Sequence, residues 1–277
     1  MAGYSRAIFD RYLNLLGVAR TAPSWEALAE LTSAHLIRIP FENVSKIHRA
    51  RVQGIRRVPS LEEYLDGVEY CNFGGTCYAN NYFLHVLLDH LGFTVRLCGA
   101  DISVNGAPPD GHMVNVVTVG GKEAIADVGY GAPFWQPIPL HGATDVIIRF
   151  GSEKYVLKPR DGAGNSRMEL YRENQLRHGY VLKPAAKRVA DFSDVIARSY
   201  SADAPFLNRL VLIRFFKDRA LTIRNHTLTE MSVSESHSSD MRTPDDIAGA
   251  VVRHFGISAS IISEVLESLG ELKNSVS

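Results

Sequence analysis

The sequence lacks three features that mark large classes of proteins: an excess of one charge, a long uncharged apolar run, and a rich set of cysteines. Its 277 residues carry 30 basic and 30 acidic side chains. Because phosphate contacts dominate affinity for nucleic acids, this balance argues against a nucleic-acid partner. The longest apolar stretches, such as 207–216, are interrupted by arginines and are shorter than the roughly 18 residues that span a membrane. We therefore expect no nucleic-acid or membrane partner.

Cysteine is scarce, with only Cys71, Cys77 and Cys98 along the chain. An odd, small number is not typical of a disulfide framework and fits a reducing cytoplasm. Residues 1–6 contain no charged segment followed by an apolar core, so no secretory signal is expected. The spacings Cys-x-x-Cys and His-Glu-x-x-His do not occur, so the sequence predicts no metal site.

One local concentration of basic residues interrupts the neutral chain. It runs from His48 to Arg51 and continues at Arg56 and Arg57. We interpret it as a solvated loop, with binding of a phosphate-bearing ligand as the alternative.

The composition is that of a globular protein with a sizeable core, and the length suggests one large or two ordinary domains. Apolar periodicity predicts four helices in the first ninety residues. The first ends at Gly17, the second begins at Ser24, the third begins with a capping box at Ser60, and the fourth runs from about Cys77 to residue 91.

After Gly92 the pattern changes to that of strands. Strands are predicted at 93–104, 113–119, 123–128, 146–150, 155–157, 168–171, 207–216 and 220–233, with a hairpin turn at Gly120 and Gly121. Thr243 and Pro244 begin a late helix, and a short helix follows Ser258. This order is not the regular alternation of a doubly wound sheet and indicates an α+β fold.

The segment 73–81 carries the first chemical signal. Gly74 and Gly75 permit a close backbone approach immediately before Cys77. A cysteine at a helix start faces free amides and the positive end of the helix dipole, which favour a thiolate. The alternative is a buried cysteine with packing glycines.

Two later residues favour catalysis. His112 lies at the start of one predicted strand and Asp127 near the end of the next, so a hairpin would bring them together. Nucleophilic acyl transfer requires a cysteine, a histidine and an acid: the thiolate attacks, the imidazole moves the proton and the carboxylate orients the ring. Taken singly, a histidine or an aspartate on a strand is more often structural. The backbone amide of Cys77 is a candidate donor to the oxyanion.

At this point the sequence resembles the arylamine N-acetyltransferases. The resemblance rests on short motifs in a fixed order over about the first 140 residues, and it weakens afterwards. The motifs are Ile39-Pro40-Phe41-Glu42-Asn43, Gly74-Gly75-Thr76-Cys77-Tyr78, Leu91-Gly92-Phe93, Gly111-His112-Met113, Asp127-Val128-Gly129-Tyr130-Gly131 and Pro133-Phe134.

The resemblance implies a triad of Cys77, His112 and Asp127. It implies a ping-pong cycle in which acetyl-coenzyme A, the cosubstrate, acetylates Cys77 and an arylamine or arylhydrazine accepts the acetyl group, as in xenobiotic metabolism. It also implies a helical bundle (1–90), a central β-barrel (91–205) and a C-terminal α/β lid (206–277) around a papain- or transglutaminase-like core.

The resemblance further assigns binding residues. It places coenzyme A at Val128, Gly129, Tyr130 and Gly131, and it lines the acceptor pocket with Phe41, Tyr130 and Phe206. Flat aromatic walls suit an aromatic amine. Plain core packing remains the alternative for Phe41 and Phe206.

Other functions remain open at this point. A related transferase with a different acyl donor or amine would use the same triad, as would a cysteine amidase-like hydrolase, and a non-catalytic binding protein could share the fold. The family usually has Arg where this chain has Phe73, and often Glu or Gln where it has Ala79. Because these two polar side chains are absent here, we expect the carboxylate of Glu42 to form hydrogen bonds with backbone amides or water.

Overall fold

The computed structural model describes residues 4–104 and 106–272. The expectation of no secretory signal concerned residues 1–6, of which 1–3 lie outside the described residues. The predicted lid, 206–277, extends beyond them at 273–277. The helices are α1 (Arg6–Leu16), α2 (Trp25–Arg38), α3 (Val44–Ile47), α4 (Leu61–Cys71), α5 (Cys77–His90), α6 (Ser193–Arg198), α7 (Pro244–Phe255) and α8 (Ala259–Leu269), with a π-helical turn η1 (His48–Val52) and 3-10 turns η2 (Val189–Phe192) and η3 (Pro205–Leu207).

The strands form two antiparallel sheets. They are β1 (Phe41–Glu42), β2 (Thr94–Ile102), β3 (His112–Val119), β4 (Lys122–Ala126), β5 (Ile138–Pro139), β6 (Val146–Phe150), β7 (Glu153–Leu157), β8 (Ser166–Arg172), β9 (Gln175–Lys187), β10 (Val211–Phe215), β11 (Arg219–Arg224), β12 (Thr227–Ser232) and β13 (Ser236–Asp240). The expected α+β class is therefore confirmed.

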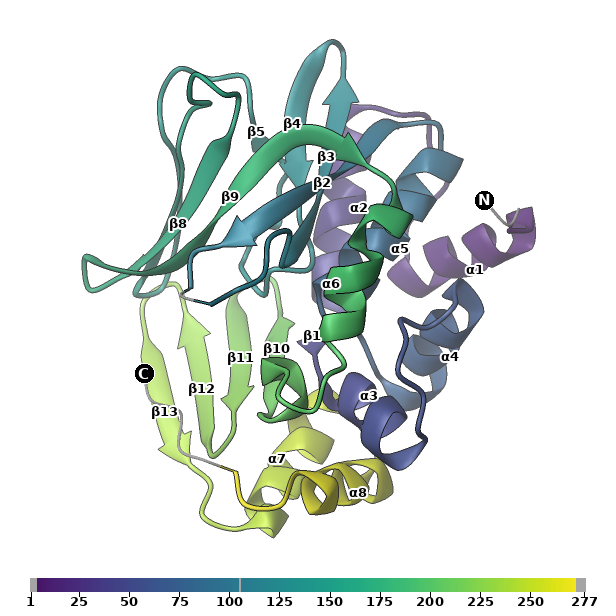
Figure 1. The fold of residues 1–277 in the computed structure, drawn as a ribbon, viewed down its shortest axis with the longest axis vertical. Helices are drawn as coiled ribbons and strands as arrows, with labels where there is room; N and C mark the ends of the chain where they lie inside the picture. The colour runs from purple at the N-terminus through teal and green to yellow at the C-terminus, as the bar shows by residue number, and fades with distance from the viewer. Residues whose placement is uncertain (1–3, 105, 273–277) are drawn as a thin grey trace.

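The larger sheet has the order β5-β4-β3-β2-β9-β8-β7-β6 and curves into a nearly closed barrel (Figure 1). Its core joins residues of β2, β3, β4, β7, β8 and β9. The barrel-like sheet expected in the middle of the chain is confirmed. The helix α5 packs against β2 and β3, which places its first residue beside the β3–β4 hairpin.

The smaller sheet has the order β1-β10-β11-β12-β13. Its edge strand β1 comes from the helical first part of the chain and pairs with β10, with Phe41 opposite Ile213. The helices α7 and α8 pack against each other, and α8 packs against η1 (Figure 1). Strand β1 and turn η1 from the first part of the chain thus pack with strand β10 and helix α8 from its C-terminal part.

Local signals in the sequence correctly located several element ends. Gly17 ends α1 in the left-handed conformation, and the hydroxyl of Ser24 accepts a hydrogen bond from the amide of Ala27 at the start of α2. Ser60 and Thr243 each form a capping box, which holds the first turns of α4 and α7. The predicted glycine hairpin joins β3 to β4.

One expectation held only in part and another was wrong. In the basic run, Arg51, Arg56 and Arg57 are exposed as expected, but 48–51 form the π-helical turn η1, in which His48 is buried. The guanidinium of Arg51 donates to the backbone carbonyl of Ser268 in α8, at 2.5 Å. The strand expected at 207–216 begins only at Val211, because Pro205 starts a 3-10 turn. Within the described residues, no helix is long and apolar enough to cross a membrane.

Candidate active site

The start of α5 presents Cys77 as its first residue. A methyl group on Gly74 would lie 1.9 Å from the carbonyl oxygen of Pro40, and one on Gly75 would lie 2.7 Å from Cβ of Ala79. Real Cβ atoms do not make such contacts. Gly74 therefore lets the chain before Cys77 pack directly on the segment that leads into β1, and Gly75 lets it pack against the first turn of α5.

Glu42 fixes this contact from the other side. Its carboxylate is fully buried and accepts hydrogen bonds from the amides of Ser45, at 2.9 Å, and Gly74, at 3.0 Å. It also accepts from the Ser45 hydroxyl at 2.5 Å. Burial raises the pKa of Glu42, and these donors oppose that rise. The expectation that Glu42 bonds to backbone amides is confirmed.

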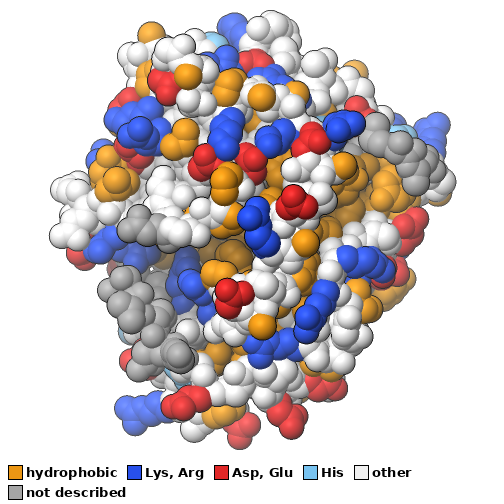
Figure 2. Space-filling view, viewed as in Figure 1, with side chains coloured by type: hydrophobic (Ala, Val, Ile, Leu, Met, Phe, Trp, Pro, Cys, Tyr) orange, Lys and Arg blue, Asp and Glu red, His pale blue; other side chains and the backbone are white. Residues whose placement is uncertain are grey.

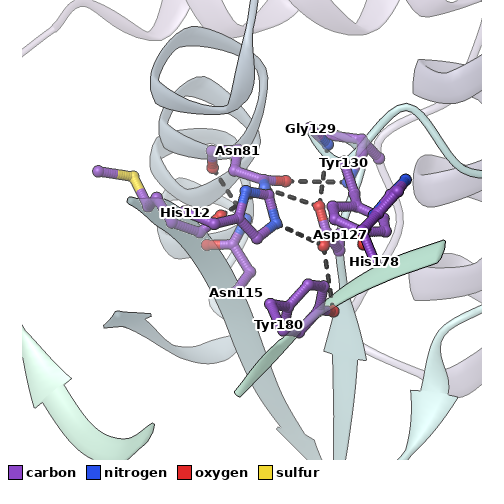
Figure 3. A network of polar contacts seen from close by, with 10 residues as sticks. Asn81, His112, Asn115, Asp127, Gly129, Tyr130, His178 and Tyr180 are labelled. Atoms are coloured by element: carbon purple, nitrogen blue, oxygen red, sulfur yellow. Dashed lines mark hydrogen bonds and ion pairs between the residues drawn. The ribbon is translucent and has the colours of Figure 1, made fainter. Parts of the chain in front are cut away.

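The β3–β4 hairpin brings His112 and Asp127 together. Asn115 pairs with Ala126, so the first residue of β3 and the residue after β4 lie at the same end of the hairpin. The imidazole Nε2 of His112 is 2.8 Å from Oδ2 of Asp127 (Figure 3). Both side chains are buried, with 3% and 0% of their areas exposed.

Asp127 is fully hydrogen-bonded. Besides His112, it accepts from the side-chain amide of Asn81 at 2.8 Å, the backbone amide of Gly129 at 3.0 Å and the hydroxyl of Tyr180 at 3.2 Å (Figure 3). A buried carboxylate with several donors retains its charge without a bulk-water shell. The network therefore holds an ionised acid behind His112.

The pKa values of the pair move in opposite directions. Burial lowers the pKa of His112, but the charge and hydrogen bond of Asp127, followed by the hydrogen bond and charge of Cys77, outweigh it and raise this pKa to about 10. Burial raises the pKa of Asp127, yet the charge of His112 and the donated hydrogen bonds bring it below its ordinary value. At neutral pH the arrangement favours an imidazolium between a carboxylate and the Cys77 sulfur.

Apolar side chains surround Cys77, which is 8% exposed. It clusters with Leu97, Met113, Phe192 and Val195. The last two belong to η2 and α6, so α6 covers the cysteine on one side. Of the histidines in the part of the chain that the structure describes, His112 is the one that bonds to a buried carboxylate, that of Asp127.

The segment 128–131 adjoins the triad but its residues point in different directions. A methyl group on Gly129 would be 2.7 Å from Cα of Cys77. The amide of Val128 donates to Asn81, and the ring of Tyr130 packs 5.4 Å from the ring of His112. Gly131 has a positive φ of 74°, and a methyl group on it would lie 2.8 Å from Cδ1 of Ile213 in β10. The segment therefore contacts the nucleophile, the base and the second sheet within four residues.

The structure brings two of the three expected acceptor-pocket residues together. The rings of Phe41 and Phe206 lie edge to face with centroids 5.8 Å apart. Both belong to an apolar cluster at the junction of the sheets, in which Phe41 is buried and Phe206 is partly exposed. Tyr130 does not join this cluster; its hydroxyl is 2.7 Å from Nδ1 of His178.

Sequence reasoning missed two residues that hold the triad. Asn81 lies four residues after Cys77 and therefore on the same helix face, a spacing that could have identified it. It bonds to Asp127 and also to the carbonyl of Met113 at 2.6 Å. Tyr180 comes from β9, a strand that was not predicted, so no local signal pointed to it.

No group of three or more histidine, cysteine, aspartate or glutamate side chains is arranged to hold a metal ion in residues 4–104 and 106–272. All three cysteines are free thiols.

The chain is similar to known proteins in sequence and in fold. A family model described as N-acetyltransferase matches residues 24–264. Proansamycin X synthase of Amycolatopsis mediterranei is 32% identical over 167 residues, which cover 56% of this chain and 61% of that protein. An arylamine N-acetyltransferase / N-hydroxyarylamine O-acetyltransferase of Salmonella typhimurium is 36% identical over 135 residues, or 47% of this chain and 45% of that protein. The chain thus aligns with less than two thirds of the length of these curated relatives.

A solved structure extends the likeness over nearly the whole chain. The arylamine N-acetyltransferase of Mycobacterium marinum in complex with CoA superposes with a TM-score of 0.80 at 19% identity, over 95% of this chain and 100% of that one. At this identity the superposition establishes the fold.

Proposed function

Since the chain belongs to the arylamine N-acetyltransferase family, we propose that it transfers an acetyl group from acetyl-coenzyme A to an arylamine or arylhydrazine. The observation that carries the proposal is the buried His112–Asp127 pair at 2.8 Å, with Cys77 at the start of α5 near enough to contribute to the raised pKa of His112.

The first half-reaction acetylates Cys77. Its thiolate attacks the thioester carbonyl carbon, the carbon–sulfur bond to coenzyme A breaks, and the imidazolium of His112 protonates the departing thiolate. Asp127 keeps Nε2 of His112 engaged so that the other ring nitrogen faces the sulfur. The amide of Cys77, which has no acceptor within the helix, stabilises the oxyanion.

The second half-reaction returns the enzyme to its starting state. The amine attacks the acetyl carbon, loses its proton to His112, and displaces the Cys77 thiolate as the amide forms. In this ping-pong scheme coenzyme A approaches along Val128, Gly129, Tyr130 and Gly131, where the glycines admit the ligand to the backbone. The aromatic acceptor lies against Phe41, Tyr130 and Phe206.

The proposal extends to architecture and location. We treat 1–90 as the helical domain, 91–205 as the barrel and 206–277 as the α/β lid around a papain- or transglutaminase-like triad. We place the reaction in the cytoplasm, where a nucleophilic thiol stays reduced.

Intact-mass measurement after incubation with acetyl-coenzyme A alone tests the mechanism. We expect the mass to rise by one acetyl group, because a ping-pong enzyme is acylated without the acceptor. Cys77→Ala should take up no acetyl group, whereas Cys71→Ala, the matched control for a free thiol, should be acetylated as fully as the wild type. A wild-type protein that forms neither the adduct nor an acetylated arylamine would refute the proposal.

One relative favours a second candidate. Proansamycin X synthase aligns over 56% of this chain, and its name differs from those of the acetyltransferases. An amide-forming transferase with another acyl donor would use the same triad. If acetyl-coenzyme A leaves Cys77 unmodified while an activated larger acyl thioester modifies it, this second candidate replaces the first.

A further inference from the structure

A pocket of about 430 Å³ lies beside the active site between α3 and η1, α4, the chain before α5, and Tyr200 after α6. Ligand sites for small molecules have volumes of about 300–1,000 Å³. Figure 2 shows a hollow lined by hydrophobic side chains on the face where α6 lies, with Lys and Arg side chains near its rim. This pocket therefore has the size and lining of a small-molecule site.

The pocket differs from the place where the triad meets. Gly74, Thr76 and Ala79 contribute to its wall, but Cys77, His112 and Asp127 do not. The side chain of Cys77 packs instead against the Leu97 and Phe192 cluster. A molecule in the pocket would touch the segment that presents the nucleophile without reaching the sulfur.

A buried ammonium group lies in the pocket wall. Lys46 is only 8% exposed, yet its Nζ has one hydrogen-bond acceptor, the hydroxyl of Ser199 at 2.8 Å, and lies 4.1 Å from the ring centroid of Tyr200. In the part of the chain that the structure describes, no carboxylate pairs with it. Burial lowers the pKa of Lys46 to about 8, so the group is charged at neutral pH. An ammonium has three donors, and among the described residues the Ser199 hydroxyl is the acceptor that receives a hydrogen bond from it, while the ring of Tyr200 faces its charge.

A second cation is also incompletely satisfied. Arg49 lines the pocket, and its buried Nε has no hydrogen-bond partner. The carboxylates at the wall are already engaged: Glu63 binds Arg57 and Arg49, and Asp66 binds Arg11. Arg49 therefore has a carboxylate partner but an unused Nε–H, and Lys46 is the cation of this wall that pairs with no carboxylate of the described residues.

We propose that this pocket binds a small aromatic carboxylate, with the carboxylate at Lys46 and the ring against apolar side chains such as Val58, Phe73 and Tyr78. Three observations converge on this class of ligand. The buried ammonium requires an anion, the aromatic walls favour a flat apolar body, and the short side chain of Ala79 leaves room for it. The site is separate from the proposed acetyl-transfer cleft, and the proposal does not depend on that reaction.

Calorimetric titration with 2-naphthoate and its neutral isostere 2-naphthamide at pH 7 tests the charge. The wild type should bind the carboxylate at least about tenfold more tightly than the amide. Lys46→Met keeps the length of the stem and removes the charge; it should lose this preference while keeping weak binding of both compounds. Lys122→Met, which replaces the exposed first residue of β4, is the matched control and should bind like the wild type.

Two further variants test the location. Ala79→Gln extends a side chain into the pocket and should lower the affinity for both compounds at least about tenfold. The affinity of Cys77→Ala for 2-naphthoate, measured in saturating coenzyme A, should equal that of the wild type without coenzyme A. The reason is that Cys77, His112 and Asp127 do not line the pocket. The proposal is overturned if the folded wild type does not prefer the carboxylate to the amide, or if Lys46→Met retains that preference. It is also overturned if coenzyme A displaces 2-naphthoate.

Discussion

The charge state of His112 depends mainly on Asp127. Burial alone would lower the pKa of the imidazole, whereas the charge and hydrogen bond of Asp127, followed by the contribution of Cys77, raise it to about 10. The folded pKa exceeds the ordinary value of 6.5, so protonation of His112 stabilises the fold fully below pH 6.5. That contribution is lost as the pH rises toward 10. The pKa of Asp127 is lowered, so its contribution is present above its ordinary value and is lost in acid.

Asp127→Asn should therefore remove both the charge and the activity. The asparagine can still accept from Asn81 and Gly129, so the fold should survive, but its amide would face Nε2 of His112 and favour the wrong tautomer. We expect transfer to fall by about 10³-fold or more. Histidine NMR titration should show His112 neutral at pH 7 in the variant and protonated in the wild type.

Tyr180→Phe is the matched control for that titration. It removes one donor to the same carboxylate oxygen but leaves the negative charge beside His112. Protonation of His112 should therefore persist at pH 7. If His112 titrates at the same pH in Asp127→Asn as in the wild type, Asp127 does not set its charge.

At the scale of elements, the position of α5 depends on the backbone contact at Gly74. Gly74→Ala should cost about 2–4 kcal/mol of unfolding free energy, because the new methyl group meets the carbonyl oxygen of Pro40 rather than a flexible side chain. Shifting the chain there would also move Cys77 and slow its acetylation. Thermal unfolding and the rate of adduct formation measure the two effects.

Gly162→Ala provides the comparison. A methyl group on Gly162 meets nothing within 4 Å, and its backbone conformation is one that other residues adopt. We expect its stability to stay within about 0.5 kcal/mol of the wild type. Equal stability of the two alanine variants would show that the contact with Pro40 is easily relieved.

Local signals predicted those elements whose ends are encoded locally. The caps at Ser24, Ser60 and Thr243 and the glycine hairpin all depend on residues within one turn. The long strand β9 was missed because its sequence contains Gly179 and Pro184, which are poor strand formers, and its place is set by pairing with β2 and β8. The two-residue strand β1 exists only because β10 lies beside it.

The residues of the site also differ in whether neighbouring sequence or long-range packing places them. Cys77, His112 and Asp127 stand in motifs that can be read from their neighbours in sequence. Tyr180 reaches Asp127 across the barrel, and Lys46 meets Ser199 from 153 positions away in sequence. Contacts of this kind follow from the packing of distant elements, so sequence periodicity could not reveal them.

At the scale of the whole molecule, the three predicted domains share their cores. One apolar cluster joins Val44 and Ile47 to residues between 200 and 272, and another joins Phe41, Phe150 and Ile213 from the helical, barrel and lid regions. Together with the pairing of β1 and β10, these clusters leave each region incomplete by itself. The regions should therefore unfold together rather than in sequence.

Two tryptophans allow this cooperativity to be measured. Trp25 lies in α2, and Trp135 packs against Phe150 and Phe215 where the sheets meet. In Trp25→Phe, urea unfolding followed by Trp135 fluorescence should give the same midpoint as far-ultraviolet circular dichroism, because a two-state protein shows coincident transitions. The reciprocal variant Trp135→Phe reports from the helical region and should give coincident transitions of its own. If Trp135 fluorescence changes at a lower urea concentration than the circular dichroism, the lid separates first, and the shared clusters are too weak to couple it to the rest.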